Sequence, residues 1–179
     1  MSGRGRCSDR AEGREAGMAF ELSAERKQRM AVLVGRYPQK AAACLPVLHL
    51  CQEEHGSIDA DVVAYVASAL ELPTGRVEEV ASFYTMYRRK AAGRYHLEIC
   101  TNLTCSLLGA EHLRDVLVKE LGIQPGQTTR DGMFTLSEVE CLASCGTAPV
   151  LQVNGEFHER LTPDSLRTLL GELRMRAGG

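Results

Sequence analysis

Residues 20–92 carry apolar side chains at the spacing of amphipathic helices. In the stretch AAACLPVLHLCQEEH, residues 41–55, Cys44, Leu48 and Cys51 recur at i, i+4 and i+7 and therefore share one face of a helix. Similar patterns occupy three more stretches, which are residues 23–37, 61–72 and 76–87. Short connections separate these stretches, so the pattern predicts a small bundle of four helices.

Turn-forming and capping residues mark where these helices are expected to begin and end. Gly56 is expected to end the second helix, and Pro46 falls in its first turn, where proline is tolerated. Asp59 or Ser57 can cap the third helix, because a short polar side chain accepts a hydrogen bond from a free backbone N–H group. Thr74 is expected to cap the fourth helix in the same way.

Beyond Gly93 the pattern changes from helical spacing to alternation. The stretches YHLEIC, residues 95–100, and FTLSEVE, residues 134–140, alternate as strands do. Between them, residues 109–121 are amphipathic and predict a helix. Asn154–Gly155 is a strong signal for a type I′ hairpin between two short strands.

A final helix follows the hairpin, with Thr162 as its N-cap and Pro163 at its first position. The order is therefore strand, helix, strand, hairpin and helix, which is typical of a thioredoxin-like α/β layer with a mixed sheet. We expect an α+β protein with a disordered tail at residues 1–19, a helical bundle at residues 20–92 and a thioredoxin-like domain at residues 93–175.

Length and charge describe a soluble protein. The 179 residues suffice for one ordinary domain or two small ones, and the net charge of −2 gives no electrostatic case for nucleic acid or an anionic membrane. No apolar run has the length of a transmembrane helix, and the N-terminus lacks the apolar core of a signal peptide. Asp9, Glu12 and Glu15 argue against an organelle transit peptide, and Met18 could be the true start. We therefore expect a cytoplasmic protein, in which structural disulfides are rare.

Four of the seven cysteines lie in two close pairs, CTNLTC and CLASC. In the expected fold Cys100 ends the first strand, and Cys105 lies just before the helix that follows. Cys141 ends the second strand, and Cys145 lies in the loop before the hairpin. If the two strands are neighbours, both loops leave the same end of the sheet, and the four sulfur atoms can converge.

The spacing within the pairs favours iron–sulfur chemistry. Zinc sites usually use two-residue gaps, whereas these gaps hold four and three residues, and the chain has no CxxC of the kind that redox dithiols use. The C-x4-C-x2-C arrangement of plant-type ferredoxins is also missing. A [2Fe–2S] cluster needs two thiolates on each iron, which two separated pairs can supply. Zinc binding and simple burial of the cysteines in the core remain alternatives.

The sequence around both pairs resembles one protein family. CTNLTC and the stretch TTRDGMFTLSEVECLASCGTAPVLQVNGEFHERLTPDSL are similar to the 24 kDa, or E, subunits of respiratory complex I, the NADH:quinone oxidoreductase. LPVLHLCQEEHGSIDADVVAYVASALELPTGRVEEVASFYTMY resembles the N-terminal helical part of those subunits. The resemblance covers residues 20–175 and has no departure at the four cysteines.

This resemblance implies a cofactor, ligands and partners. It implies that Cys100, Cys105, Cys141 and Cys145 bind one [2Fe–2S] cluster in a thioredoxin-like ferredoxin domain. NADH and FMN are then expected only on a partner flavoprotein subunit, with an adjoining large iron–sulfur subunit as a second partner. The chain would exchange single electrons with the flavin, without catalytic residues of its own, as a peripheral protein at the inner face of the bacterial inner membrane. A mitochondrial matrix location is less favoured.

Several other residues have competing interpretations. Cys44 and Cys51 fall on an apolar helical face, where core packing is favoured over a metal site shared with His49 or His55. Pro149 precedes a strand and could be cis, as in thioredoxin-like folds.

Two alternative functions remain open. The same module serves NAD-linked hydrogenases and formate dehydrogenases, and the subunits that distinguish these complexes are on other chains. The succession of two predicted helices and a short turn in residues 61–90 also resembles a helix-turn-helix. This motif would make the protein an iron–sulfur redox-sensing regulator of transcription. Charge argues against DNA binding, because Glu78 and Glu79 on the expected reading helix would repel phosphates.

Overall fold

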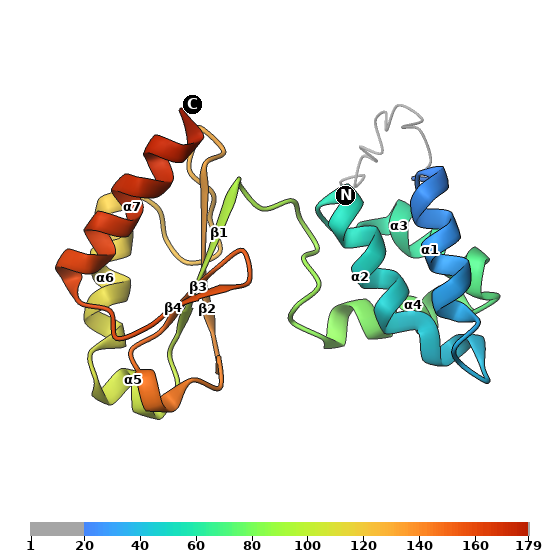
Figure 1. The fold of residues 1–179 in the computed structure, drawn as a ribbon, viewed down its shortest axis with the longest axis horizontal. Helices are drawn as coiled ribbons and strands as arrows, with labels where there is room; N and C mark the ends of the chain where they lie inside the picture. Colours follow the sequence, from blue (N-terminus) through green and yellow to red (C-terminus); the bar gives the residue numbers. More distant parts are fainter. Residues whose placement is uncertain (1–19, 179) are drawn as a thin grey trace, which may run out of the picture. The chain divides into compact units, whose positions relative to one another are not determined.

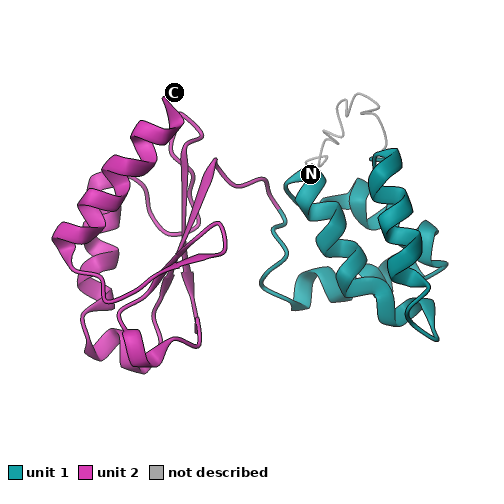
Figure 2. Ribbon diagram, viewed as in Figure 1, with its two compact units in different colours: residues 1–89 teal, residues 90–179 magenta. Residues whose placement is uncertain are grey.

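The computed structural model describes residues 20–178, which fall into two compact units that meet in the sequence between Arg89 and Lys90 (Figure 2). The expected disordered tail at residues 1–19, and Met18 within it, lie outside the described residues. The order of elements is helices first and then a mixed sheet with helices, so the expected α+β class is confirmed.

The first unit is a helical bundle, as its apolar spacing predicts (Figure 1). Its described elements are α1 (Ala24–Val34), the 3-10 helix η1 (Lys40–Ala43), α2 (Cys44–His55), α3 (Ala60–Leu70) and α4 (Thr74–Phe83). Cys44, Leu48 and Cys51, which the spacing places on one face of α2, are all buried in the core of this unit.

Two of the three expected helix boundaries are confirmed, and one is wrong. Gly56 ends α2 in the left-handed conformation, with φ of 87°. Asp59 caps α3, because its Oδ1 accepts the N–H groups of Asp61 and Val62 at 3.1 and 3.0 Å. Thr74 does not cap α4 but is its first residue, since Pro73, with φ of −58° and ψ of 137°, occupies the capping position.

The helix α4 ends at Phe83, four residues before the expected end at Tyr87. Polar contacts to α2 explain the early end. Gln52 donates to the Met86 carbonyl at 3.0 Å and accepts the Arg88 N–H at 2.6 Å, which holds this segment in a turn, where the Tyr87 N–H donates to the Tyr84 carbonyl at 3.1 Å. Tyr87 is buried there, and its hydroxyl donates to the Leu45 carbonyl at 2.8 Å.

The second unit is a four-stranded sheet with helices, shown in Figure 1. The strand order is β2-β1-β3-β4, with β1 and β2 parallel and the other neighbours antiparallel. The helices α6 and α7 lie on the same side of the sheet in Figure 1. The described elements are β1 (Tyr95–Cys100), α5 (Leu103–Leu107), α6 (Ala110–Leu121), β2 (Phe134–Val139), the 3-10 helix η2 (Cys145–Thr147), β3 (Leu151–Val153), β4 (Glu156–His158) and α7 (Pro163–Ala177).

The expected hairpin and the start of the last helix are both confirmed. Asn154 and Gly155 have φ of 50° and 92°, the left-handed pair that a type I′ turn requires. Thr162 caps α7 through a capping box with Ser165, and Pro163 takes the first helical position.

Gly93, where the sequence pattern changes, has a specific structural role beside β2. A Cβ atom at this position would lie 2.7 Å from the Gly132 carbonyl oxygen, so only glycine fits. The Gly93 N–H donates to Thr135 Oγ1 at 2.7 Å. This close approach aligns the chain that leads into β1 with the start of β2.

The sheet and helices enclose a core of aliphatic side chains that holds the strand ends in place. Leu97 and Ile99 of β1, Leu136 of β2 and Leu151 of β3 are fully or almost fully buried there, together with Leu117 of α6. Cys100 is the last residue of β1, as expected, and Cys141 lies two residues beyond the end of β2.

Candidate metal centre

The two cysteine pairs follow two adjacent parallel strands. β1 and β2 pair in parallel, with Cys100 opposite Val139, so both strands end at the same edge of the sheet. Beyond the strands, the Thr101 N–H still donates to the Val139 carbonyl at 3.0 Å. The prediction that both loops leave the same end of the sheet is therefore confirmed.

Cys105 lies inside a short helix that the sequence pattern does not predict. The pattern places Cys105 just before the first helix of this unit, but it is part of α5, which precedes α6. Asn102 caps α5, with its Oδ1 accepting the Leu103 N–H at 2.9 Å, and Gly109 separates the two helices with φ of 98°. Five residues are too few to show a helical period, but Asn102, a residue type that often caps helices, is a sequence signal for the start of α5.

The second pair lies in a loop on the protein surface. The strand β2 ends at Val139, so Cys141 does not end the strand as expected but lies two residues beyond it, and its side chain is exposed. The Ala143 N–H donates to Cys141 Sγ at 3.2 Å. Ala143 has φ of 56°, which turns the chain sharply before Cys145, the exposed first residue of η2.

The first pair is buried, and its thiols interact. Cys100 and Cys105 are 3% and 2% exposed, in a small apolar cluster with Ala110. Burial, a hydrogen bond to Cys100 and the nearby Cys145 together raise the pKa of Cys105 to about 11, against a smaller lowering by the Val150 backbone. Of the four candidate cysteines, Cys100 and Cys145 therefore both lie close enough to Cys105 to influence its pKa.

The four cysteines do not form a complete metal-binding site in this structure. Within residues 20–178, no group of three or more His, Cys, Asp or Glu side chains is placed to hold a metal ion. The donor set nevertheless suits an iron–sulfur cluster, because it consists entirely of thiols, in the number that a [2Fe–2S] cluster uses. The buried pair lies in a small apolar cluster, and a backbone N–H group donates to the sulfur of Cys141.

The alternative site around His49 and His55 is not formed in the described part of the chain. His55 Nε2 lies 2.8 Å from Asp59 Oδ2, and the His49 ring packs against Tyr87 with ring centroids 5.1 Å apart. Cys51 is completely buried, which confirms core packing as its role. The Ala148–Pro149 peptide bond is cis, as thioredoxin-like folds suggest.

Comparison with known proteins identifies relatives over most of the chain. The sequence model of the thioredoxin-like [2Fe–2S] ferredoxin family matches residues 30–174. The E subunit of the NADH-quinone oxidoreductase of Mycobacterium tuberculosis (strain ATCC 25618 / H37Rv) is 43% identical over 142 residues, which cover 79% of this chain and 56% of that relative. The protein of the same name from Rickettsia felis is 41% identical over 143 residues, 78% of this chain and 86% of the relative.

A solved structure shares the same fold at lower identity. An NAD+-reducing [NiFe]-hydrogenase in the air-oxidized state superposes with a TM-score of 0.66 and 26% identity, over 74% of this chain and 23% of the hydrogenase chain. The matching part is therefore a small share of that longer protein.

The mixed sheet and its helices define a thioredoxin-like fold in the second unit. The chain belongs to the thioredoxin-like [2Fe–2S] ferredoxin family, as the resemblance of its sequence predicts. It spans 56% of the length of the mycobacterial relatives. Family membership leaves the helix-turn-helix interpretation without support. None of the helices among residues 20–178 is both long and apolar enough to cross a membrane.

Proposed function

We propose that Cys100, Cys105, Cys141 and Cys145 hold one [2Fe–2S] cluster. The observation that carries this proposal is the placement of two cysteine pairs after adjacent parallel strands in a chain of this family. Four thiolates make up the ligand set of such a cluster, which takes up and returns one electron when bound.

The surrounding residues of the chain suit this role. The apolar cluster around Cys100 and Cys105 keeps water from the inner side of the site. The thiol of Cys105, with its pKa of about 11, carries a proton at neutral pH and gives it up when a metal binds. The Ala143 N–H stabilises negative charge on Cys141 Sγ, and such hydrogen bonds help set a reduction potential.

We also propose that the chain works as the electron-transfer component of an NADH-quinone oxidoreductase. Relatives of that name, at 43% and 41% identity over most of this chain, support the assignment. In this proposal a partner flavoprotein subunit binds NADH and FMN, and a large iron–sulfur subunit adjoins it. The chain itself contributes no catalytic residue, and partners hold it at the cytoplasmic face of the membrane. The sequence has no GxGxxG fingerprint for a dinucleotide, which agrees with this division.

An NAD-linked hydrogenase is the second candidate host, because the structure of an NAD+-reducing [NiFe]-hydrogenase contains the same fold. An equivalent place in a formate dehydrogenase belongs to the same alternative. The genes beside this one would distinguish the hosts. Quinone-reducing membrane subunits indicate the oxidoreductase, and a nickel–iron or molybdenum subunit indicates the alternative.

The cluster proposal is tested by electron paramagnetic resonance together with iron and sulfide analysis of the anaerobically purified chain. We expect an S = 1/2 signal after reduction with dithionite, and equal amounts of iron and acid-labile sulfide. The variant Cys141→Ser should lose or change this signal. A colourless protein that contains zinc in place of iron would refute the electron-transfer function.

A further inference from the structure

A carboxylate that follows the hairpin holds both ends of the turn that carries Cys145. Glu159 Oε1 accepts hydrogen bonds from Ser144 Oγ and from Thr147 Oγ1, each at 2.6 Å. Ser144 directly precedes Cys145, and Thr147 is the last residue of η2. A single side chain therefore bridges the short turn from one end to the other.

The geometry assigns both hydroxyl protons to Glu159. The two hydroxyl oxygens lie 2.7 Å apart, and Thr147 Oγ1 is also 3.2 Å from the Ser144 carbonyl. Each hydroxyl has one proton, and a charged acceptor forms the stronger hydrogen bond, so the shortest contacts to the carboxylate take both. The hydrogen bonds from Ser144 and Thr147 also lower the pKa of Glu159, so the side chain is ionised at neutral pH.

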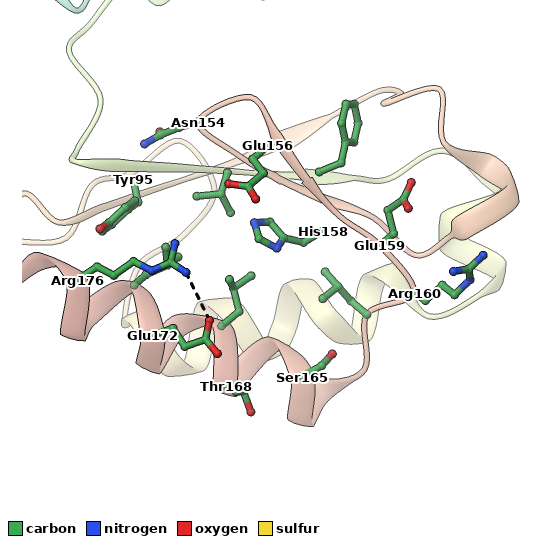
Figure 3. A pocket seen from close by; sticks show the side chains of 15 residues that line it. Tyr95, Asn154, Glu156, His158, Glu159, Arg160, Ser165, Thr168, Glu172 and Arg176 are labelled. Atoms are coloured by element: carbon green, nitrogen blue, oxygen red, sulfur yellow. Dashed lines mark ion pairs between the residues drawn. The ribbon is translucent and has the colours of Figure 1, made fainter.

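Backbone hydrogen bonds continue this connection beyond Glu159. The Arg160 N–H donates to the Thr147 carbonyl at 2.8 Å, and the Leu161 N–H donates to the Pro149 carbonyl at 3.2 Å. Figure 3 shows Glu159 beyond His158, at the end of the hairpin away from Asn154. The segment that follows β4 is thus joined to the Cys145 turn by backbone and side chain together.

We propose that Glu159 is a positioning residue for the candidate metal centre, which fixes the Cys145 turn through Ser144 and Thr147. The inference rests on the cluster proposed above. Cys145 is exposed at the start of a three-residue 3-10 helix, so this turn has little packing of its own to hold it. Residues that orient metal ligands typically change metal affinity by about 10- to 100-fold when they are replaced.

The charge of Glu159 adds a second effect that simple loop support would not have. A negative charge near the site disfavours the addition of an electron. Neutralising Glu159 should therefore make the reduction potential more positive, while a change that only loosens the loop should mainly accelerate loss of iron.

Five variants of the full chain separate these effects. Glu159→Gln removes the charge but keeps one oxygen acceptor, Glu159→Ala removes both, and Glu159→Asp keeps the charge. Glu156→Gln is the matched control, because Glu156 is exposed in the same hairpin and its side chain makes no hydrogen bond or ion pair with other residues in the range 20–178. The fifth variant, Ser144→Ala with Thr147→Val, removes the two donors and leaves the carboxylate in place.

The experiment measures iron loss to EDTA and the midpoint potential after anaerobic reconstitution with iron and sulfide. We expect EDTA to strip iron about tenfold faster from Glu159→Ala than from the wild type. The midpoint potential of Glu159→Gln should be more positive than that of the wild type. Glu159→Asp should be close to the wild type both in its rate of iron loss and in its midpoint potential. The variant without the two hydroxyls should lose iron quickly with a smaller change in potential, and Glu156→Gln should match the wild type.

The outcomes distinguish a failure of the role proposed for Glu159 from a failure of the cluster proposal. Equal iron loss and equal potentials in Glu159→Gln, Glu159→Ala and Glu156→Gln would overturn the role of Glu159 and leave the cluster intact. A wild-type chain that takes up no iron and sulfide would refute the proposed function, and this inference with it. Thermal unfolding before reconstitution identifies a folding defect, and if Glu159→Ala is unfolded, Glu159→Gln and Glu159→Asp decide the question.

Discussion

At the scale of single residues, the cysteines among residues 20–178 differ mainly in their exposure. Cys51 is completely buried, and burial is the main cause that raises its pKa to about 12, so almost none of it is thiolate at pH 8. Cys141 and Cys145 are exposed. In the iron-free chain at pH 8, we expect iodoacetamide to modify Cys141 and Cys145 well before Cys51, as measured by peptide mass spectrometry. Chain unfolded in guanidinium is the control, in which all cysteines should react at similar rates; early alkylation of native Cys51 would contradict the assigned packing.

At the scale of elements, the path after α4 depends on one amide side chain. Gln52 is 9% exposed and bonds both the Met86 carbonyl and the Arg88 N–H. Gln52→Leu keeps the volume but leaves both backbone groups without this partner, so it should lower the free energy of unfolding by about 1–3 kcal/mol. Urea denaturation of the full chain followed by circular dichroism measures the change. Gln28→Leu, on the exposed face of α1, should change it by less than about 0.5 kcal/mol, and equal effects would contradict the role of Gln52.

The same elements show what the sequence could and could not predict. Local signals predicted the cap at Asp59, the hairpin at Asn154–Gly155 and both cysteine pairs, because each depends on neighbouring residues. The end of α4 could not be predicted, since Gln52 sets it from a distant helix. Glu159 was missed for the same reason, as it meets Ser144 across 15 residues of sequence.

At the scale of the whole molecule, the two units have separate hydrophobic cores. The core around Leu48 is built from residues 22–87, and the core around Leu136 from residues 97–173, with no buried residue in common. Both leucines are completely buried, so replacing either with alanine should cost about 2–5 kcal/mol. Hydrogen exchange measured by mass spectrometry should show which of the two units is destabilised, because its backbone amides exchange faster.

We expect Leu48→Ala to speed exchange in α1 to α4 and to leave the strands β1 and β2 protected. Leu136→Ala should have the opposite effect, with faster exchange in the sheet and unchanged protection of the bundle, because each cavity weakens only the core that surrounds it. The two variants serve as controls for each other, since both remove the same side chain from a fully buried position. Faster exchange throughout the chain in either variant would show that the units unfold as one, and a substitution in the helical unit would then also weaken the loops that carry the cysteines.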